Sequence, residues 1–239
     1  MMPTYVFLTL FFSIFLSGGL LFTYGRISGK NLKLLLAFSG AYLFSLSVLH
    51  LLPEVYDSGG YHIGIFILAG FFLQIILEIF SEGIEHGHMH VHREHGKAFP
   101  FALMAGLCIH SLLEGVPLAQ RFADESTRTS LLAGIILHHI PVAIALMTML
   151  LDSGIGKRSS LLYLAVFAAM APLGAFGGAI MSQHASHDLT LLFDRFMALV
   201  IGIFLHISTT ILFESYEEHR YNIYKLLTIV AGAALALLS

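Results

Sequence analysis

The feature that most constrains the fold is a series of long apolar segments that recurs along the whole chain. Each is close to the ~20 residues with which an α-helix crosses a bilayer. Their approximate bounds are 5–24, 32–53, 61–80, 99–120, 129–151, 159–182, 190–213 and 222–238. The first has no basic stretch before it and no small-residue cleavage site, so we interpret it as a retained helix rather than a signal peptide. The pattern predicts an all-α integral membrane protein with eight transmembrane helices in one bundle.

The composition supports this class of protein. Hydrophobic residues make up 57% of the 239 residues and charged residues 11%, against roughly 45–50% and 25% in soluble domains. Connections are short apart from the stretch 81–98, so we expect residues 1–239 to form a single membrane domain. Cys108 is the only cysteine, which excludes an internal disulfide. The net charge of -3 and the lack of a basic stripe argue against nucleic acid as a partner.

The basic residues predict the orientation in the membrane. Nine of the twelve lie after the first, third, fifth and seventh segments: Arg26, Lys30, Lys33, Arg93, Lys97, Lys157, Arg158, Arg220 and Lys225. The other three are Arg121, Arg128 and Arg195. Because basic residues are enriched in cytoplasmic loops, we expect both termini outside and the stretch 81–98 in the cytoplasm. The location expected is the plasma membrane, as a multi-pass protein, which in a bacterium is the inner membrane.

The stretch 81–98 is rich in histidine. Five histidines fall within ten residues: His86, His88, His90, His92 and His95. Such a composition is typical of metal binding, and the alternate spacing suits an extended chain that gathers ligands without a fixed geometry. The alternative is a solvated polar loop that binds metal only incidentally. We expect a loop that accepts metal on the cytoplasmic side.

The fourth and fifth segments carry ionisable side chains at membrane depth. His110 and Glu114 share one helical face at spacing i, i+4, and Ser111 lies three residues before Glu114. His138 and His139 follow one segment later. Such groups cost roughly 2.5–3.5 kcal/mol each on insertion scales and usually serve a function. Imidazole and carboxylate are ligands of zinc and neighbouring divalent metals, so we predict a metal site. The alternative is a set of hydrogen bonds between packed helices.

Prolines lie close to these side chains and to a polar pair in the second segment. Pro117 and Pro141 each remove a backbone donor, so we expect kinks and carbonyl oxygens freed beside the site. In the second segment, Pro53 lies between His50 and Glu54. Pro53 either ends the helix there, with the polar residues at the headgroups, or His50 and Glu54 belong to an entrance or exit of a pathway.

At these residues the chain resembles the ZIP (Zrt/Irt-like) family of divalent metal transporters. The stretches that carry the resemblance are His50–Glu54, Gly70–Glu78, His110–Gly115, His138–Pro141, Ala171–Ala175 and Gly202–His206. The resemblance implies eight helices, termini outside and a His-rich cytoplasmic loop between the third and fourth helices. It also implies that His110, Glu114 and His138 form the primary transport site, with His139 in an adjoining second site.

Three positions depart from the family pattern. Ser111 stands where the family usually has Asn, Val142-Ala143 where it has Glu-Gly, and Ala171 where an acidic or amide side chain is common. Val142 cannot bridge two ions as the family carboxylate does. Because a second divalent ion would leave a large uncompensated charge at low dielectric, we predict one metal ion and not two.

The function expected is movement of a divalent cation toward the cytoplasm by alternating access around a mid-membrane site, and not enzymatic catalysis. Nitrogen-rich ligation favours Zn²⁺ as the substrate, with Fe²⁺, Mn²⁺ or Cd²⁺ as alternatives. The partners expected are the metal ion, the lipid bilayer and, as one option, a second copy of the chain in a homodimer. Two other functions stay open. One is a metal sensor or degenerate member that does not transport. The other is an intramembrane zinc hydrolase with Glu114 as its base, although no second carboxylate lies nearby.

Overall fold

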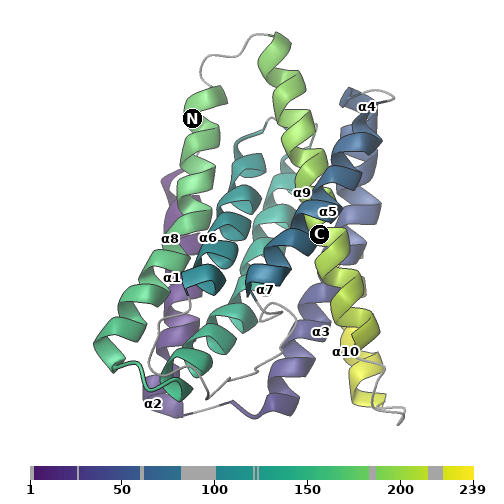
Figure 1. Ribbon diagram of the computed structural model, residues 1–239. Coiled ribbons are helices and arrows are strands. Elements are labelled where there is room, and N and C mark those ends of the chain that lie inside the picture. Colours follow the sequence, from purple (N-terminus) through teal and green to yellow (C-terminus); the bar gives the residue numbers. More distant parts are fainter. Residues whose placement is uncertain are drawn as a thin grey trace.

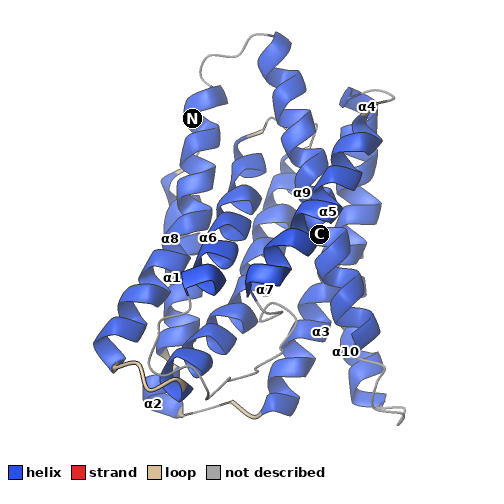
Figure 2. Cartoon of the chain, in the orientation of Figure 1, coloured by secondary structure: helices blue, strands red, loops and turns tan. Residues whose placement is uncertain are grey.

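Helices are the only regular secondary structure in the described part of the chain (Figures 1 and 2). The computed structural model describes residues 3–25, 27–59, 62–81, 101–120, 122, 124–182, 187–214 and 223–239. In order the elements are α1 (Thr4–Gly19), α2 (Leu21–Tyr24), α3 (Gly29–Leu46), the π-helical turn η1 (Ser47–Leu51), α4 (Leu52–Gly59), α5 (Ile63–Ser81), α6 (Phe101–Gly115), the 3-10 turn η3 (Val116–Ala119), α7 (Glu125–Asp152), α8 (Lys157–Ser182), α9 (His187–Glu214) and α10 (Ile223–Leu238). The predicted all-α class is confirmed.

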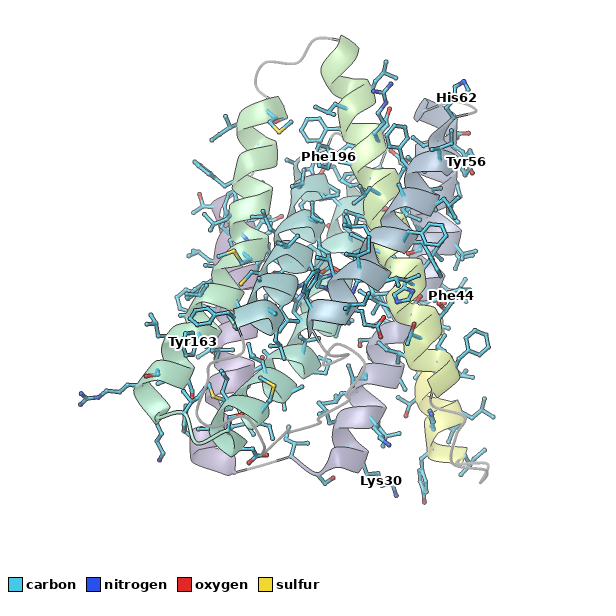
Figure 3. The ribbon with its side chains drawn as sticks, viewed as in Figure 1. Lys30, Phe44, Tyr56, His62, Tyr163 and Phe196 are labelled. Carbon is cyan, nitrogen blue, oxygen red and sulfur yellow. The ribbon has the colours of Figure 1, made fainter. Side chains whose placement is uncertain are left out.

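Six helical stretches of the described chain are long and apolar enough to cross a membrane. They are Gly29–Asp57, Ile63–Phe80, Phe101–Ala119, Glu125–Asp152, Lys157–Ser182 and Leu191–Phe213. Helices α1 and α10 are also apolar but have 16 residues each. Figure 3 shows the side chains of Lys30 and His62 at opposite ends of the bundle, with apolar residues such as Phe44 on the surface between them. The eight predicted segments all coincide with apolar helices, while the count of eight membrane crossings stays a prediction.

The helices pack in two groups. In the first group, α1 lies against α7 and α8, and α6 lies against α8. In the second group, α3 lies against α9 and α10, and α5 lies against α9. The groups meet where α3 runs along α7 and where α5 runs along α6. The ionisable residues of the fourth and fifth predicted segments therefore all belong to helices of the first group.

Helices α6 and α8 approach each other through small residues. A Cβ atom at Gly174 would overlap the carbonyl oxygen of Leu112, and one at Gly115 would overlap the carbonyl oxygen of Ala171. Helix pairs in membranes commonly use such residues because the absence of a side chain lets the two backbones come close. The close approach fixes the height and rotation of α6, which carries two of the predicted ligands.

Helix α7 begins at a capping residue. The Oδ1 atom of Asp124 accepts a hydrogen bond of 3.0 Å from the backbone N–H of Ser126, as expected of an aspartate that precedes a helix. This bond to a backbone N–H holds the pKa of the exposed Asp124 carboxyl below its usual value. The cap defines the start of α7, the longer of the two helices that carry predicted ligands, and α7 continues through Pro141 to Asp152.

The second predicted segment does not end at Pro53. The helix widens in η1, where the N–H of Leu52 donates to the carbonyl of Ser47 five residues back, and α4 then continues to Gly59. Because proline has no N–H, the carbonyl four residues before it loses its usual partner, and a π-helical turn accommodates this locally. Pro53 therefore interrupts the helical pattern without terminating the helix. By contrast, α6 ends at Gly115 and passes into η3, which contains Pro117.

The contact between α6 and α8 yields a test of the packing. Replacing Gly174 by Ala should destabilise the protein by about 1–3 kcal/mol, because the added methyl group meets backbone that cannot move aside. Gly177→Ala is the control on the same helix, since a Cβ there meets nothing within 4 Å. Thermal unfolding in detergent should show a lower midpoint for Gly174→Ala only. Equal midpoints for the two variants would contradict the close approach of α6 and α8.

Candidate metal site

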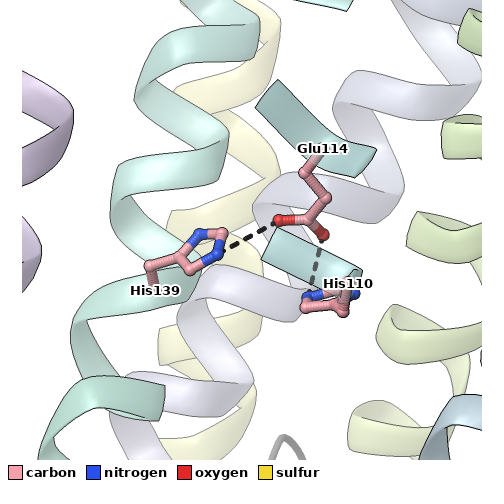
Figure 4. A group of neighbouring side chains, drawn as sticks. All are labelled: His110, Glu114 and His139. Atoms are coloured by element: carbon pink, nitrogen blue, oxygen red, sulfur yellow. Dashed lines mark ion pairs between the residues drawn. The ribbon is translucent and has the colours of Figure 1, made fainter. Parts of the chain in front are cut away.

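Three buried side chains from α6 and α7 converge in the interior of the bundle (Figure 4). The Nε2 atom of His110 lies 3.1 Å from Oε1 of Glu114, which is one helical turn later on α6. The Nε2 atom of His139 on α7 lies 3.5 Å from Oε2 of the same carboxylate. All three side chains are 0% exposed. One carboxylate therefore faces an imidazole with each of its oxygens, and it links the two helices.

These separations suit the ligands of a single metal ion. Zinc binds imidazole nitrogen and carboxylate oxygen at about 2.0–2.2 Å, so two ligands at a tetrahedral angle lie about 3.3–3.6 Å apart. The distances are 3.1 Å from Oε1 of Glu114 to His110 and 3.5 Å from Oε2 to His139, so the match at both involves both carboxylate oxygens. Ligand atoms of all three residues lie within 4.8 Å of one another. The group could hold one ion with little movement of its side chains.

The tautomer of His139 is set by a hydrogen bond within α7. Its Nδ1 atom lies 2.8 Å from the carbonyl oxygen of Ile135. A carbonyl oxygen can only accept, so Nδ1 donates this bond and Nε2 is the ring nitrogen that faces Glu114. Metal-binding histidines almost always donate their second ring N–H to such a partner, which fixes the ring and raises its basicity. His139 thus has the arrangement expected of a ligand.

His138 lies beside this group. Its ring centroid is 5.8 Å from that of His110 and 5.7 Å from that of His139, but it is not among the three residues whose ligand atoms come together. The resemblance implied a primary site of His110, Glu114 and His138 with His139 adjoining it, and that assignment stays a prediction. Successive helical residues point about 100° apart, so the rotation of α7 about its axis decides between them.

The remaining predicted residues of the core have distinct surroundings. Ser111 is 0% exposed, and its hydroxyl has no hydrogen-bond partner among the described residues. A buried hydroxyl in this state is unusual, and it lies next in sequence to the ligand His110. Val142 and Ala171 are buried among apolar side chains. Two of the three positions that depart from the family pattern are therefore part of the hydrophobic core.

The predicted entrance or exit residues lie elsewhere. The Nε2 atom of His50 lies 3.0 Å from the carbonyl oxygen of Ala236, so the imidazole caps the last turn of α10. Glu54 is half-buried in the first turn of α4. His86, His88, His90, His92 and His95 lie outside the described residues. The structure brings neither His50 nor Glu54 into the group formed by His110, Glu114 and His139.

Sequence reasoning did not predict two polar contacts between distant segments. Glu78 on α5 and His206 on α9 form an ion pair of 2.6 Å. Gln120, which follows η3, donates a hydrogen bond of 3.0 Å to Asp194 on α9, and both side chains are buried. The two partners are 128 residues apart in one contact and 74 residues apart in the other, so no local spacing in the sequence pairs them. The packing of α5 against α9 brings the first pair together, and the packing of the two helix groups brings the second pair together.

The comparisons with known proteins agree with the geometry. The family model described as ZIP zinc transporter matches residues 98–239, which include α6, α7 and both ligand-bearing stretches. A comparison with curated proteins gives no match. The matched region covers more than half of the chain and contains the buried histidine and glutamate group. The chain therefore belongs to the ZIP family of zinc transporters, and it is an integral, multi-pass membrane protein.

Proposed function

We propose that the protein carries Zn²⁺ across the membrane toward the cytoplasm through a site formed by His110, Glu114 and His139. The observation that carries this proposal is the fully buried group of two imidazoles and one carboxylate at ligand spacing. Family membership supports transport of a divalent metal. The orientation proposed has eight crossings, both termini outside and the loop at 81–98 in the cytoplasm, because nine of the twelve basic residues fall on that side.

The proposed site holds one ion. Two neutral imidazoles and one carboxylate leave a divalent ion with a net charge of about +1, which a water molecule or a freed carbonyl can help to solvate. A second ion would need another carboxylate, whereas Val142 and Ala171 are apolar. Ser111 and His138 are the nearest candidates for a fourth ligand. The ligand set of two nitrogens and one oxygen favours zinc over magnesium or manganese, with Fe²⁺ and Cd²⁺ as competing substrates.

One competing function is metal binding without transport, as in a sensor or a degenerate transporter. It is favoured by the apolar residues at positions 142 and 171, where the family pattern has ligands. Uptake of metal into sealed vesicles separates the two functions, because a sensor binds the ion without moving it. The cytoplasmic histidines between residues 86 and 95 would accept the released ion in the transport proposal.

Uptake tests the proposed function. Proteoliposomes that contain the protein should accumulate Zn²⁺, and cells that express it should gain zinc from the medium. Glu114→Gln should reduce uptake by more than about a hundredfold, because it removes the buried charge that neutralises the ion. Glu125→Gln is the control, since its carboxylate is exposed at the start of α7. Zinc loss from the expressing cells would reverse the direction, and binding without accumulation would favour the sensor.

The two adjacent histidines of α7 provide a test of the ligand set. In protein whose loop histidines are replaced by serine, equilibrium binding should show one Zn²⁺ per chain. His139→Ala should weaken this binding at least about tenfold, the loss that even an outer partner of a ligand can cause. His138→Ala should weaken it less, because its nitrogens lie outside the group. Two bound ions, or a larger effect at His138, would contradict the proposed site.

Alternating access requires the two helix groups to move relative to each other. The buried bond from Gln120 to Asp194 joins the groups, whereas Phe7 on α1 and Phe176 on α8 are in contact within the first group, with ring centroids 6.4 Å apart. Cysteine pairs at these two places, in a Cys108→Ser background, therefore distinguish a link between the groups from a link within one group.

A reversible bifunctional thiol reagent should stop uptake by the Gln120→Cys/Asp194→Cys protein until a reductant is added. The same reagent should leave uptake by the Phe7→Cys/Phe176→Cys protein unchanged, because that link lies within one group. Mass spectrometry would establish that both links form. Full uptake with the link between positions 120 and 194 in place would contradict relative movement of the groups.

A further inference from the structure

Helix α8 contributes an aromatic ring to the candidate site. The ring centroid of Phe167 lies 5.4 Å from that of His139, with 36° between the ring planes. Phe167 is 0% exposed and belongs to the same hydrophobic cluster as Val142. The phenyl ring therefore covers one side of the imidazole whose Nε2 atom faces Glu114.

Helix α8 is also the element on which both ligand-bearing helices pack. Helix α6 lies against α8 through Gly115 and Gly174, and α7 lies against α8 as well. A side chain of α8 in contact with a ligand can therefore set the position of that ligand relative to the other helix. Phe167 is the residue in this position, one turn before Ala171.

The imidazole of His139 has two side-chain torsions to be fixed. The hydrogen bond from Nδ1 to Ile135 holds one edge of the ring, but the ring can still tilt about that bond. Contact with a large, rigid ring from another helix opposes the tilt, because packed aromatic rings prefer a limited set of arrangements. We propose that Phe167 is a positioning residue that holds the His139 imidazole with Nε2 toward the metal position.

This inference rests on the proposed function, and it extends the site to a third helix that carries no ligand. A ligand that is already in place loses less freedom when the ion binds, so affinity rises. The gain in affinity is greater for Zn²⁺, which has a small radius and a preference for tetrahedral ligands. It is smaller for the larger Cd²⁺, which tolerates a less ordered set of ligands. Phe167 should therefore favour zinc over cadmium.

The test compares two buried phenylalanines in protein whose loop histidines are replaced by serine. Phe167→Leu removes the flat ring beside His139, and Phe204→Leu makes the same change at an equally buried ring of α9 in the other hydrophobic cluster. Phe167→Leu should weaken Zn²⁺ binding about three- to tenfold, as expected for loss of an ordered side chain, and should weaken Cd²⁺ binding less. Phe204→Leu should lower the melting temperature without changing the ratio of the two affinities.

A double-mutant cycle separates positioning from general packing. In a His139→Asn background, Phe167→Leu should have no further effect on Zn²⁺ affinity, because the side chain that it positions is gone. Phe167→Tyr, which keeps the ring, should retain the wild-type affinity ratio. The absorption spectrum of bound Co²⁺ should lose its tetrahedral character in Phe167→Leu only. Phe167→Met gives the same comparison if the leucine variant does not fold.

The outcomes distinguish this inference from the proposed function. If the parent protein binds no Zn²⁺ in its helical core, both are overturned. If the parent binds one ion and Phe167→Leu binds zinc and cadmium as the parent does, only the role of Phe167 is overturned. Equal losses with and without His139 would also overturn it, because the effect would then not pass through that imidazole.

Discussion

The burial of the Glu114 carboxylate is the constraint on which the rest of the structure depends. An isolated ionised group in a medium of low dielectric is very unfavourable, so it needs charges or hydrogen-bond donors around it. Here the carboxylate is 0% exposed, and each of its oxygens faces an imidazole. Such a group is hard to explain by packing alone, since apolar residues of similar volume would fill the space more favourably. In the proposed function, a bound divalent ion would provide the missing charge.

The packing around the carboxylate explains how such a site can be held in a membrane. Close contact through glycine fixes α6 against α8, and Asp124 defines the start of α7. Both ligand-bearing helices belong to the first group, so the distances among His110, Glu114 and His139 depend on contacts within that group. In the proposed mechanism, the site would keep its geometry while the second group shifts. This separation of binding from movement is what a carrier needs.

The all-α class of the fold follows from local patterns in the sequence and is confirmed, while the ligand set of the metal site stays a prediction. Apolar segments of bilayer length and the i, i+4 spacing of His110 and Glu114 can be read without knowledge of the packing. The choice between His138 and His139 could not be made in the same way, since it depends on the rotation of α7. The partners of Glu78 and Asp194 could not be predicted either, because each partner lies far away in the sequence. Of the two interpretations of Pro53, helix termination is wrong for a local reason, because a π-helical turn accommodates the missing N–H.

The polar contacts that join the two helix groups have a thermodynamic consequence. The hydroxyl of Tyr42 on α3 donates to the carbonyl of Ser130 at 3.0 Å, and Gln120 donates to Asp194 on α9. Both bonds hold the short region from Gln120 to Ser130 against the second group. A buried hydrogen bond contributes about 0.5–1.5 kcal/mol, so two of them bias a conformational equilibrium by roughly five- to 150-fold. In the proposed cycle, the empty carrier would mainly occupy the conformation in which the region from Gln120 to Ser130 is closed against the second group. Opening that region would cost free energy in each turnover.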